Sequence, residues 1–274
     1  MSDNDQEVVP LGGLPVTKRV VLKKRQIDVA LFEVRFSASD NIITPGQGFE
    51  IQGLISDVDV PLPRIQPAQK QQIAVSVNAT EPVSQVEVQG RGWQFLTSDD
   101  SVIVTVMPDS FAVQTTAYER WSVSILPFLQ ALVKAIAKVL RPELVYRVGL
   151  RYVNRLVDES AKSPTAWLGK INDRLLGAVQ DPELGRLLTS TQQQLELKLG
   201  DSAGAVLRHG AFIDSASRGA TSYLIDTDVF SVEACRFDLD LISKRARTLN
   251  VTALALFQQV VTAAYHDEMQ PVEI

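Results

Sequence analysis

Hydrophobic and polar residues alternate most regularly over residues 147–156, which read Arg-Val-Gly-Leu-Arg-Tyr-Val-Asn-Arg-Leu. In a strand, successive side chains point to opposite faces of the sheet. One face of this predicted strand is hydrophobic and carries Val148, Leu150, Tyr152 and Leu156. The other face carries Arg147, Arg151 and Arg155, spaced about 13 Å apart at the usual strand rise. The pattern predicts a strand that packs on a core with one face and presents positive charge on the other.

Shorter runs with the same period of two predict further strands. They cover residues 27–36, 73–78, 84–96, 102–106, 111–115, 195–199, 205–213 and 223–233. Several runs are separated only by turn residues, such as Ser98-Asp99-Asp100 and Pro108-Asp109. Tight turns between alternating runs are typical of antiparallel sheets.

Two long stretches, residues 118–140 and 239–266, instead repeat their hydrophobic residues at helical spacing. Pro127 lies inside the first and predicts either a kink or the true start of the helix. Between residues 41 and 72 the pattern is weak. Glycines at positions 46, 48 and 53 disfavour a short helix there, and prolines at 61, 63 and 67 favour an extended segment.

Three or four strands followed by a long helix thus occur twice along the chain. We therefore predict an α+β protein of two pseudo-repeated halves, each an antiparallel sheet covered by a long helix. The predicted boundaries are an N-terminal arm at 1–26, a first half at 27–158 and a second half at 159–274. We expect the two halves to pack as one compact unit, with residues 147–156 near their junction.

The composition and net charge of the chain disfavour several classes of function. Of 274 residues, 45% are hydrophobic and 22% charged, as in globular proteins with a sizeable core. A net charge of −5 disfavours binding to nucleic acid or to an anionic membrane surface. The N-terminal residues 1–5 lack the basic start of a signal peptide, and no apolar run approaches the length of a membrane span. A single cysteine suits a reducing compartment, so we expect a cytoplasmic protein.

The arginine face allows two interpretations. Three arginines on one strand can clamp phosphates or carboxylates of a ligand. They can also pair across strands with Glu33, Asp226 and Asp228, forming a ladder of ion pairs within the sheet. We favour the ladder. The residues that form either the polar network or the ligand site are Glu33, Arg147, Arg151, Tyr152, Asn154, Asp226 and Asp228.

Other reactive side chains favour structural roles. Asp226 and Asp228 have a spacing that can hold a divalent cation, but such spacing is common by chance, and the sequence does not place Asp214 of the preceding loop beside them. His209 and His266 belong to no recognised nucleophile motif. Cys235 is interpreted as a small buried apolar group. No nucleotide-binding or zinc-protease motif occurs, and we expect no metal and no cofactor.

The segment Gly149-Leu150-Arg151-Tyr152-Val153-Asn154-Arg155 resembles the central signature of a sporadically distributed bacterial family of uncharacterised proteins. Further similarity lies in residues 30–36, 92–95, 115–121, 224–230 and 256–265. The resemblance covers most of residues 27–269 and leaves the N-terminal arm outside. It implies that Arg151, Tyr152, Asn154, Asp226 and Asp228 belong to one pattern, either a polar network or a site, and it implies no activity.

The sequence favours a non-catalytic protein-binding or assembly protein, since unpaired edges of antiparallel sheets invite strand pairing. The partner would be another protein or a second copy, and the N-terminal arm would reach a neighbouring subunit. Two alternatives stay open. One is a ligand-binding protein or enzyme with an anion or cation site at the junction of the halves. The other is a partner component of a mobile defence or toxin-neutralising system.

Overall fold

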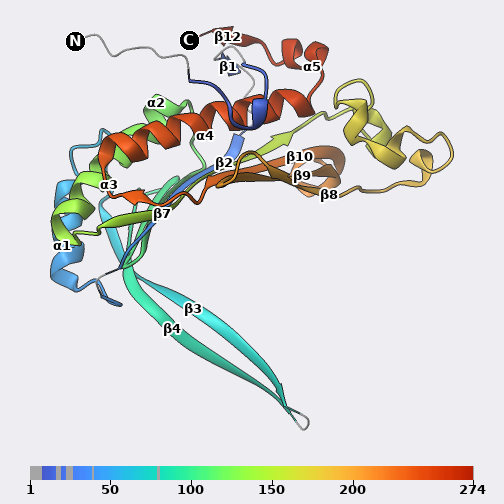
Figure 1. Ribbon diagram of the computed structural model, residues 1–274. Coiled ribbons are helices and arrows are strands. Elements are labelled where there is room, and N and C mark those ends of the chain that lie inside the picture. The colour runs from blue at the N-terminus through green and yellow to red at the C-terminus, as the bar shows by residue number, and fades with distance from the viewer. Residues whose placement is uncertain (1–7, 17–19, 23–26, 39, 79–80, 274) are drawn as a thin grey trace.

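The computed structural model describes residues 8–16, 20–22, 27–38, 40–78 and 81–273. It shows an α+β fold built on a ten-stranded antiparallel sheet (Figure 1). The strands are β2 (Ile27–Phe36), β3 (Arg64–Asn78), β4 (Glu81–Leu96), β5 (Val102–Met107), β6 (Ser110–Thr115), β7 (Leu144–Leu156), β8 (Gln193–Lys198), β9 (Ala203–Asp214), β10 (Ala220–Ser231) and β11 (Cys235–Arg236). A separate two-stranded sheet pairs β1 (Val20–Leu22) with β12 (Pro271–Glu273).

The strand predicted from the arginine pattern, β7, lies inside the large sheet. The order across the sheet is β3-β4-β5-β6-β2-β7-β10-β9-β8, and β11 pairs with one end of β7. β7 therefore pairs with β2 from the first predicted half and with β10 from the second. The antiparallel α+β class is confirmed. The two pseudo-repeated halves are not confirmed, because their strands form one continuous sheet.

The helices cover one face of this sheet (Figure 1). They are α1 (Pro45–Leu54), α2 (Trp121–Ser124), α3 (Leu126–Val139), α4 (Leu239–Val260) and α5 (Ala263–Glu268). Pro127 stands in the first turn of α3, where its missing N–H costs no helical hydrogen bond. The prediction that this proline marks the true start of the helix is confirmed. The second predicted helix is divided at Val261 into α4 and α5.

Helix α1 forms despite the glycines that disfavoured it. Thr44 caps it, with a reciprocal pair of hydrogen bonds between Thr44 and Gln47. A Cβ at Gly48 would lie 2.8 Å from the indole ring of Trp93, so this glycine makes room for the tryptophan. Trp93 in turn donates its indole N–H to the carbonyl oxygen of Ile43 at 3.0 Å. Tertiary packing against β4 thus outweighs the low helix propensity of glycine.

The core lies between the helices and the covered face of the sheet. Alternate residues of β2 and β7, among them Phe32, Val34, Val148 and Leu150, are fully buried there. The segment from α2 to α3, Trp121–Val139, is long and apolar enough to cross a membrane by length and composition. Its apolar stripe packs into this core, as Phe128, Leu129, Leu132, Val133 and Ile136 show. We therefore interpret it as a core helix.

The N-terminal segment 8–16 packs against its own chain. Leu11 donates its backbone N–H to the hydroxyl of Thr252 on α4 at 3.0 Å, and Leu11 and Leu14 join the main hydrophobic cluster. Gly12 lies against Leu199, which follows β8. Residues 1–7, 17–19 and 23–26 of the predicted arm fall outside the described residues. The part that is described contacts α4 of its own chain.

Candidate functional site

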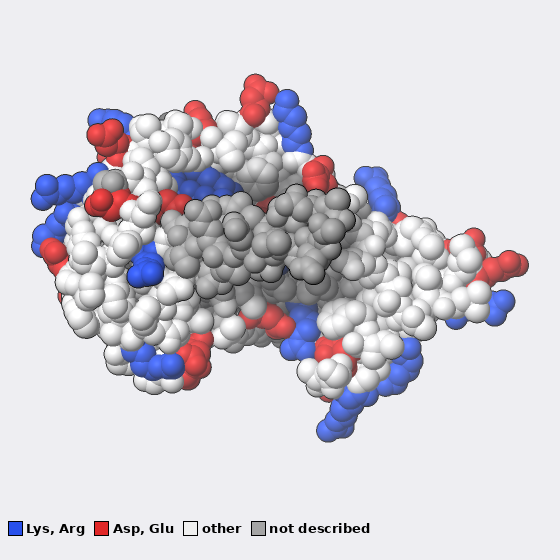
Figure 2. All heavy atoms as spheres, turned by 90° about the horizontal axis from the view of Figure 1, so that it is seen from below, with Lys and Arg blue, Asp and Glu red and all other residues white. Residues whose placement is uncertain are grey.

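The face of the sheet opposite the helices carries the predicted arginines. The register places Arg151 opposite Asp228 on β10 and opposite Leu31 on β2, so the odd-numbered residues of β7 from Arg147 to Arg155 point to this open face. Charged side chains of both signs lie side by side on this side of the molecule (Figure 2). The alternation of the sequence is thus confirmed: β7 is packed on one face and charged on the other.

Arg147 is held between two strands. Its guanidinium donates to Glu33 at 2.7 Å and to Asp228 at 3.4 Å, and its carbon Cζ lies 5.1 Å from the centre of the Phe230 ring. A Cβ at Gly149 would lie only 2.3 Å from Nη1 of Arg147. Glycine at this position therefore lets the guanidinium lie across the backbone of β7, where it reaches both carboxylates and the aromatic ring.

Arg151 makes the strongest pair of the network. It donates from Nε and Nη2 to the two carboxylate oxygens of Asp226, both at 2.7 Å. The Asp226 side chain is only 5% exposed, and Arg208 of β9 approaches it from the other side at 3.4 Å. The hydrogen bonds that Arg151 donates to Asp226 raise the pKa of Arg151 above its usual value. This two-pronged geometry fixes the orientation of both side chains.

Arg155 connects two acidic residues that the sequence analysis did not assign to the network. It donates to Asp28 at 2.6 Å and to Asp214 at 2.9 Å. Asp214 also accepts hydrogen bonds from Ser217, Ser222 and the backbone N–H of Ala216. Burial alone would raise the pKa of Asp214, but these hydrogen bonds outweigh burial and lower it to about 2.

All three arginines of β7 are therefore paired with carboxylates of the same chain. The cross-strand ladder that we favoured is the arrangement found, and Glu33, Asp226 and Asp228 are its acceptors as predicted. The arginines keep 20% to 43% of their side-chain surface exposed, so the ladder is only partly sealed from solvent. Among the described residues, no group of three or more acidic, histidine or cysteine side chains is arranged to hold a metal ion.

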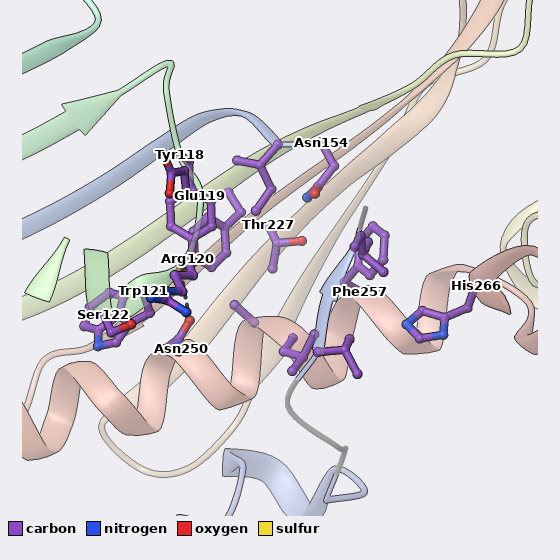
Figure 3. Close-up of a pocket in the computed structure, with 16 residues that line it drawn as sticks. Tyr118, Glu119, Arg120, Trp121, Ser122, Asn154, Thr227, Asn250, Phe257 and His266 are labelled. Carbon is purple, nitrogen blue, oxygen red and sulfur yellow. Dashed lines mark hydrogen bonds between the residues drawn. The ribbon is translucent and has the colours of Figure 1, made fainter. Parts of the chain in front are cut away.

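Two of the predicted site residues do not belong to this network. Tyr152 and Asn154 are even-numbered residues of β7, and both point to the covered face. There they line a cavity of about 520 Å³ between the sheet, α4 and β1 (Figure 3). The pattern implied by the family resemblance is thus divided by the sheet. Arg151, Asp226 and Asp228 lie on one side and Tyr152 and Asn154 on the other.

The histidines and the cysteine also lie on the helix side or at its edge. His209 is buried, and its Nδ1 lies 2.8 Å from the hydroxyl of Tyr223. Burial lowers the pKa of His209, which favours the neutral ring. His266 of α5 lines the cavity (Figure 3). Cys235 packs against the main hydrophobic cluster, as predicted for an apolar group, but it is half-buried and not fully buried.

A long hairpin extends from the sheet, away from the helices (Figure 1). Only residues 93–96 of β4 pair with β5, whereas β3 and β4 pair with each other as far as Asn78 and Glu81. We call the ribbon formed by residues 70–78 and 81–90 the β3–β4 arm. It is about 27 Å long at the usual strand rise. Among the described strands, β3 pairs only with β4, so the outer edge of the arm has no strand partner.

Comparisons with family models and with curated proteins find no match for this chain. The resemblance to a sporadically distributed bacterial family therefore stays a prediction that rests on the residues around Arg151. The function has to be argued from the geometry of the ladder, the arm and the cavity.

Two aspartates of the open face are expected to contribute differently to stability, as their substitution by asparagine should show. A folded-state pKa of about 2 means that Asp214 stabilises the fold above its unfolded-state pKa and loses this effect as the pH falls through 2. Asp214→Asn should lower the free energy of unfolding by about 2 kcal/mol at pH 7, and the difference should shrink between roughly pH 4 and pH 2. Urea unfolding over this pH range measures it.

Asp228→Asn is the matched control. Burial raises the pKa of Asp228, although Arg147 and Arg151 act against this shift. A carboxyl group whose pKa is raised in the folded state stabilises the fold most below its unfolded-state pKa. This contribution is lost as the pH rises through the folded-state pKa. Neutralising Asp228 should therefore cost no stability at pH 7. Equal losses in the two variants would contradict this assignment of the two carboxylates.

Proposed function

We propose that this protein is a non-catalytic assembly protein in which the β3–β4 arms of two copies join edge to edge. The observation that carries the proposal is the arm itself, a two-stranded ribbon that projects beyond the sheet, with the outer edge of β3 not paired to any of the described strands. An unpaired edge presents a row of backbone N–H and C=O groups that another strand can satisfy.

The composition of the arm supports strand pairing. Residues 70–90 contain three charged residues, Lys70, Glu81 and Glu87, in 21 positions. They are rich in the β-branched residues Ile73, Val75, Val77, Val83, Val86 and Val88. Proteins usually protect exposed edges with charges, prolines or short strands. A long edge of low charge is instead typical of a surface that adds a strand from a partner.

Stability gives a second reason. A two-stranded hairpin without further packing is at best marginally stable in water, whereas three or more strands support one another. Antiparallel pairing of β3 with β3 of a second copy produces a four-stranded sheet. Such an interface is self-complementary, because each residue pair occurs twice about a twofold axis. Pairing between copies therefore supplies the missing strands without any other protein.

The open-face ladder fits an assembly role better than a ligand clamp. Arg147, Arg151 and Arg155 direct their hydrogen bonds to carboxylates on neighbouring strands. A ligand anion would have to displace Asp226, which is almost completely buried. The ladder holds β2, β7 and β10 together at the centre of the sheet, and this provides a firm base for the projecting arm.

The test is to shorten the arm. Gln69 and Arg91 are register partners, so a two-residue Asn-Gly turn can replace residues 70–90 and close the hairpin at its base. Light scattering over a concentration series should give twice the chain mass of 30.1 kDa for the full protein and the monomer mass for the shortened variant. The unfolding temperature should stay unchanged, because β4 still pairs with β5.

Two further variants test whether the edge of β3 itself forms the interface. Ala74→Lys combined with Ser76→Lys keeps the length of the arm but adds charge to the edge, and it should also give monomers. Arg64→Ala at the base of β3 removes only an exposed ion pair with Asp100, so it should leave the dimer intact. A full-length protein that stays monomeric at every concentration, or a shortened variant that still forms dimers, would refute the proposal.

A further inference from the structure

We infer that the cavity on the helix side of the sheet binds an uncharged small molecule that combines a carbonyl group with an apolar body. The cavity lies under α4, between β7 and β10 on one side and β1 and α5 on the others (Figure 3). Its volume of about 520 Å³ is within the range of small-molecule sites. It lies on the opposite face of the sheet from the ladder, so this inference does not depend on the assembly proposal.

Three residues that line this cavity carry a buried polar atom without a hydrogen-bond partner. Among the described residues, four buried side-chain atoms have no hydrogen-bond partner: Nε1 of Trp121, Oγ1 of Thr227, Nε2 of His266 and Nε2 of His209. The first three belong to residues that line the cavity. Leaving a buried polar group unpaired is costly. Three such groups around one cavity indicate that a bound molecule supplies their partners.

Thr227 is the most informative of the three. It is 1% exposed, and its side chain points from β10 toward the helix side, where Phe257 and His266 bound the cavity (Figure 3). Asn154 points into the same space from β7, and its amide donates a long hydrogen bond of 3.4 Å to the Ile225 carbonyl. A hydroxyl and an amide side by side can both donate to and accept from one ligand group.

The ligand should be neutral. Glu119 and Arg120 are the only aspartate, glutamate, lysine or arginine residues that line the cavity among the described residues, and both are exposed. Inside, Tyr118 donates to the Tyr152 oxygen at 3.1 Å, and Tyr152 donates to Oδ1 of Asn250 at 2.9 Å. Burial raises the pKa of Tyr118 to about 12, so its hydroxyl stays protonated. Among the described residues, a ligand charge buried beside Thr227 and Asn154, away from the two exposed charged residues, would find no ionic partner in the cavity lining and would be costly.

The ligand should also carry an acceptor and an apolar body. The indole N–H of Trp121 can only donate, so its partner is an acceptor such as a carbonyl oxygen. The remaining wall is aliphatic and aromatic, formed by Val20, Leu22, Ile27, Ala253, Leu254 and Phe257. Acyl or aryl amides, esters and ketones combine these properties, whereas fatty acids and alkylammonium ions of the same size do not.

The experiment uses a fluorescent probe and three competitors. N-phenyl-1-naphthylamine is uncharged and apolar, and its emission should rise when it enters the cavity of the full-length protein. Octanamide should displace it, and octanoate and octylammonium of the same chain length should displace it at least about tenfold less well. A protein that gives no emission change with the probe, or one from which octanoate displaces it equally well, would overturn the inference.

Two variants locate the site. Thr227→Val keeps the volume but removes the hydroxyl, so octanamide should bind about fivefold more weakly. The unfolding midpoint of this variant should equal or exceed that of the natural protein, because an unpaired buried hydroxyl is lost. Thr221→Val is the matched control: Thr221 is buried on the same strand and face but does not line the cavity. Ala253→Leu should fill the cavity and weaken binding of the probe itself. Equal octanamide affinity in Thr227→Val and the natural protein would refute the assignment of this site.

Discussion

Arg151→Ala is expected to lower the free energy of unfolding by about 3 kcal/mol at neutral pH. The substitution leaves the Asp226 carboxylate, which is only 5% exposed, without its two hydrogen bonds of 2.7 Å. Arg208 remains at 3.4 Å and can compensate only in part. Removing one partner of a buried pair is costly because the other charge stays in a poorly solvated place. Urea unfolding followed by circular dichroism measures the loss.

The comparison with two further variants isolates the cause. Arg151→Lys keeps the charge, but a single ammonium group cannot reproduce the two-pronged bond. It should therefore lower the free energy of unfolding, but by less than Arg151→Ala does. Arg35→Ala removes an arginine on the same face that is 54% exposed and pairs with Glu33 at 3.0 Å. Its loss should stay below about 1 kcal/mol. Similar losses for Arg151→Ala and Arg35→Ala would show that burial of Asp226 does not govern the ladder.

The ladder was predictable from the sequence because a strand has a period of two. Arg147, Arg151 and Arg155 had to share a face, and aspartates two apart on another strand had to share one as well. The same rule places Tyr152 and Asn154 on the other face. Grouping these two residues with the arginines relied on their proximity in one motif, and a motif that lies along a strand is divided between the two sides of the sheet.

The acidic partners of Arg155 could not be predicted in this way. The pairing of β2 with β7 shifts register between Ile27 and Val29, which brings Asp28 within 2.6 Å of Arg155. A bulge of this kind changes which residues share a face and leaves no clear periodic signal. Asp214 comes from the end of β9 and is positioned by the turn that follows. Both contacts depend on how distant segments meet.

The order of the strands across the sheet could also not be predicted from the sequence. The alternating runs predicted the strands, but the same runs are compatible with two small sheets or with one large one. The pairing of β7 with both β2 and β10 decides between them, and it joins residues far apart in the chain. The cavity depends on tertiary packing in the same way, because the indole of Trp121, the hydroxyl of Thr227 and the ring of His266 come from three separate elements.

The sheet separates two sets of interactions. On one side, ion pairs join the central strands β2, β7 and β10, and on the other side a cavity lined by residues with unpaired polar atoms lies beneath α4. β7 contributes to both sides through alternate residues. Substitutions at the odd-numbered positions of β7 from Arg147 to Arg155 should therefore change stability without changing ligand binding, since these residues do not line the cavity.

The second large effect is expected for Trp167→Ala, at about 4 kcal/mol. Trp167 lies in the short helical turn Pro164–Trp167 and is completely buried. Its ring packs against Tyr223 of β10 and edge-on against Tyr265 of α5, with ring centres 5.4 Å and 6.0 Å away. Its indole N–H donates to the Thr221 carbonyl at 3.0 Å, so alanine leaves both a cavity and an unpaired carbonyl.

Trp167→Phe should lose about half as much, because it keeps most of the ring packing and removes only the hydrogen bond to Thr221. Tyr146→Ala provides the control, since that ring is 48% exposed on β7 and should cost less than about 1 kcal/mol. Urea unfolding gives the three free energies, and near-ultraviolet circular dichroism reports the aromatic packing. If Trp167→Ala lost no more than Tyr146→Ala, the segment between β7 and β8 would not share the core of the sheet. The larger loss is expected because Trp167 packs in one hydrophobic cluster with Tyr265 of α5. Through this contact the segment holds α5, and with it His266, at the end of the cavity.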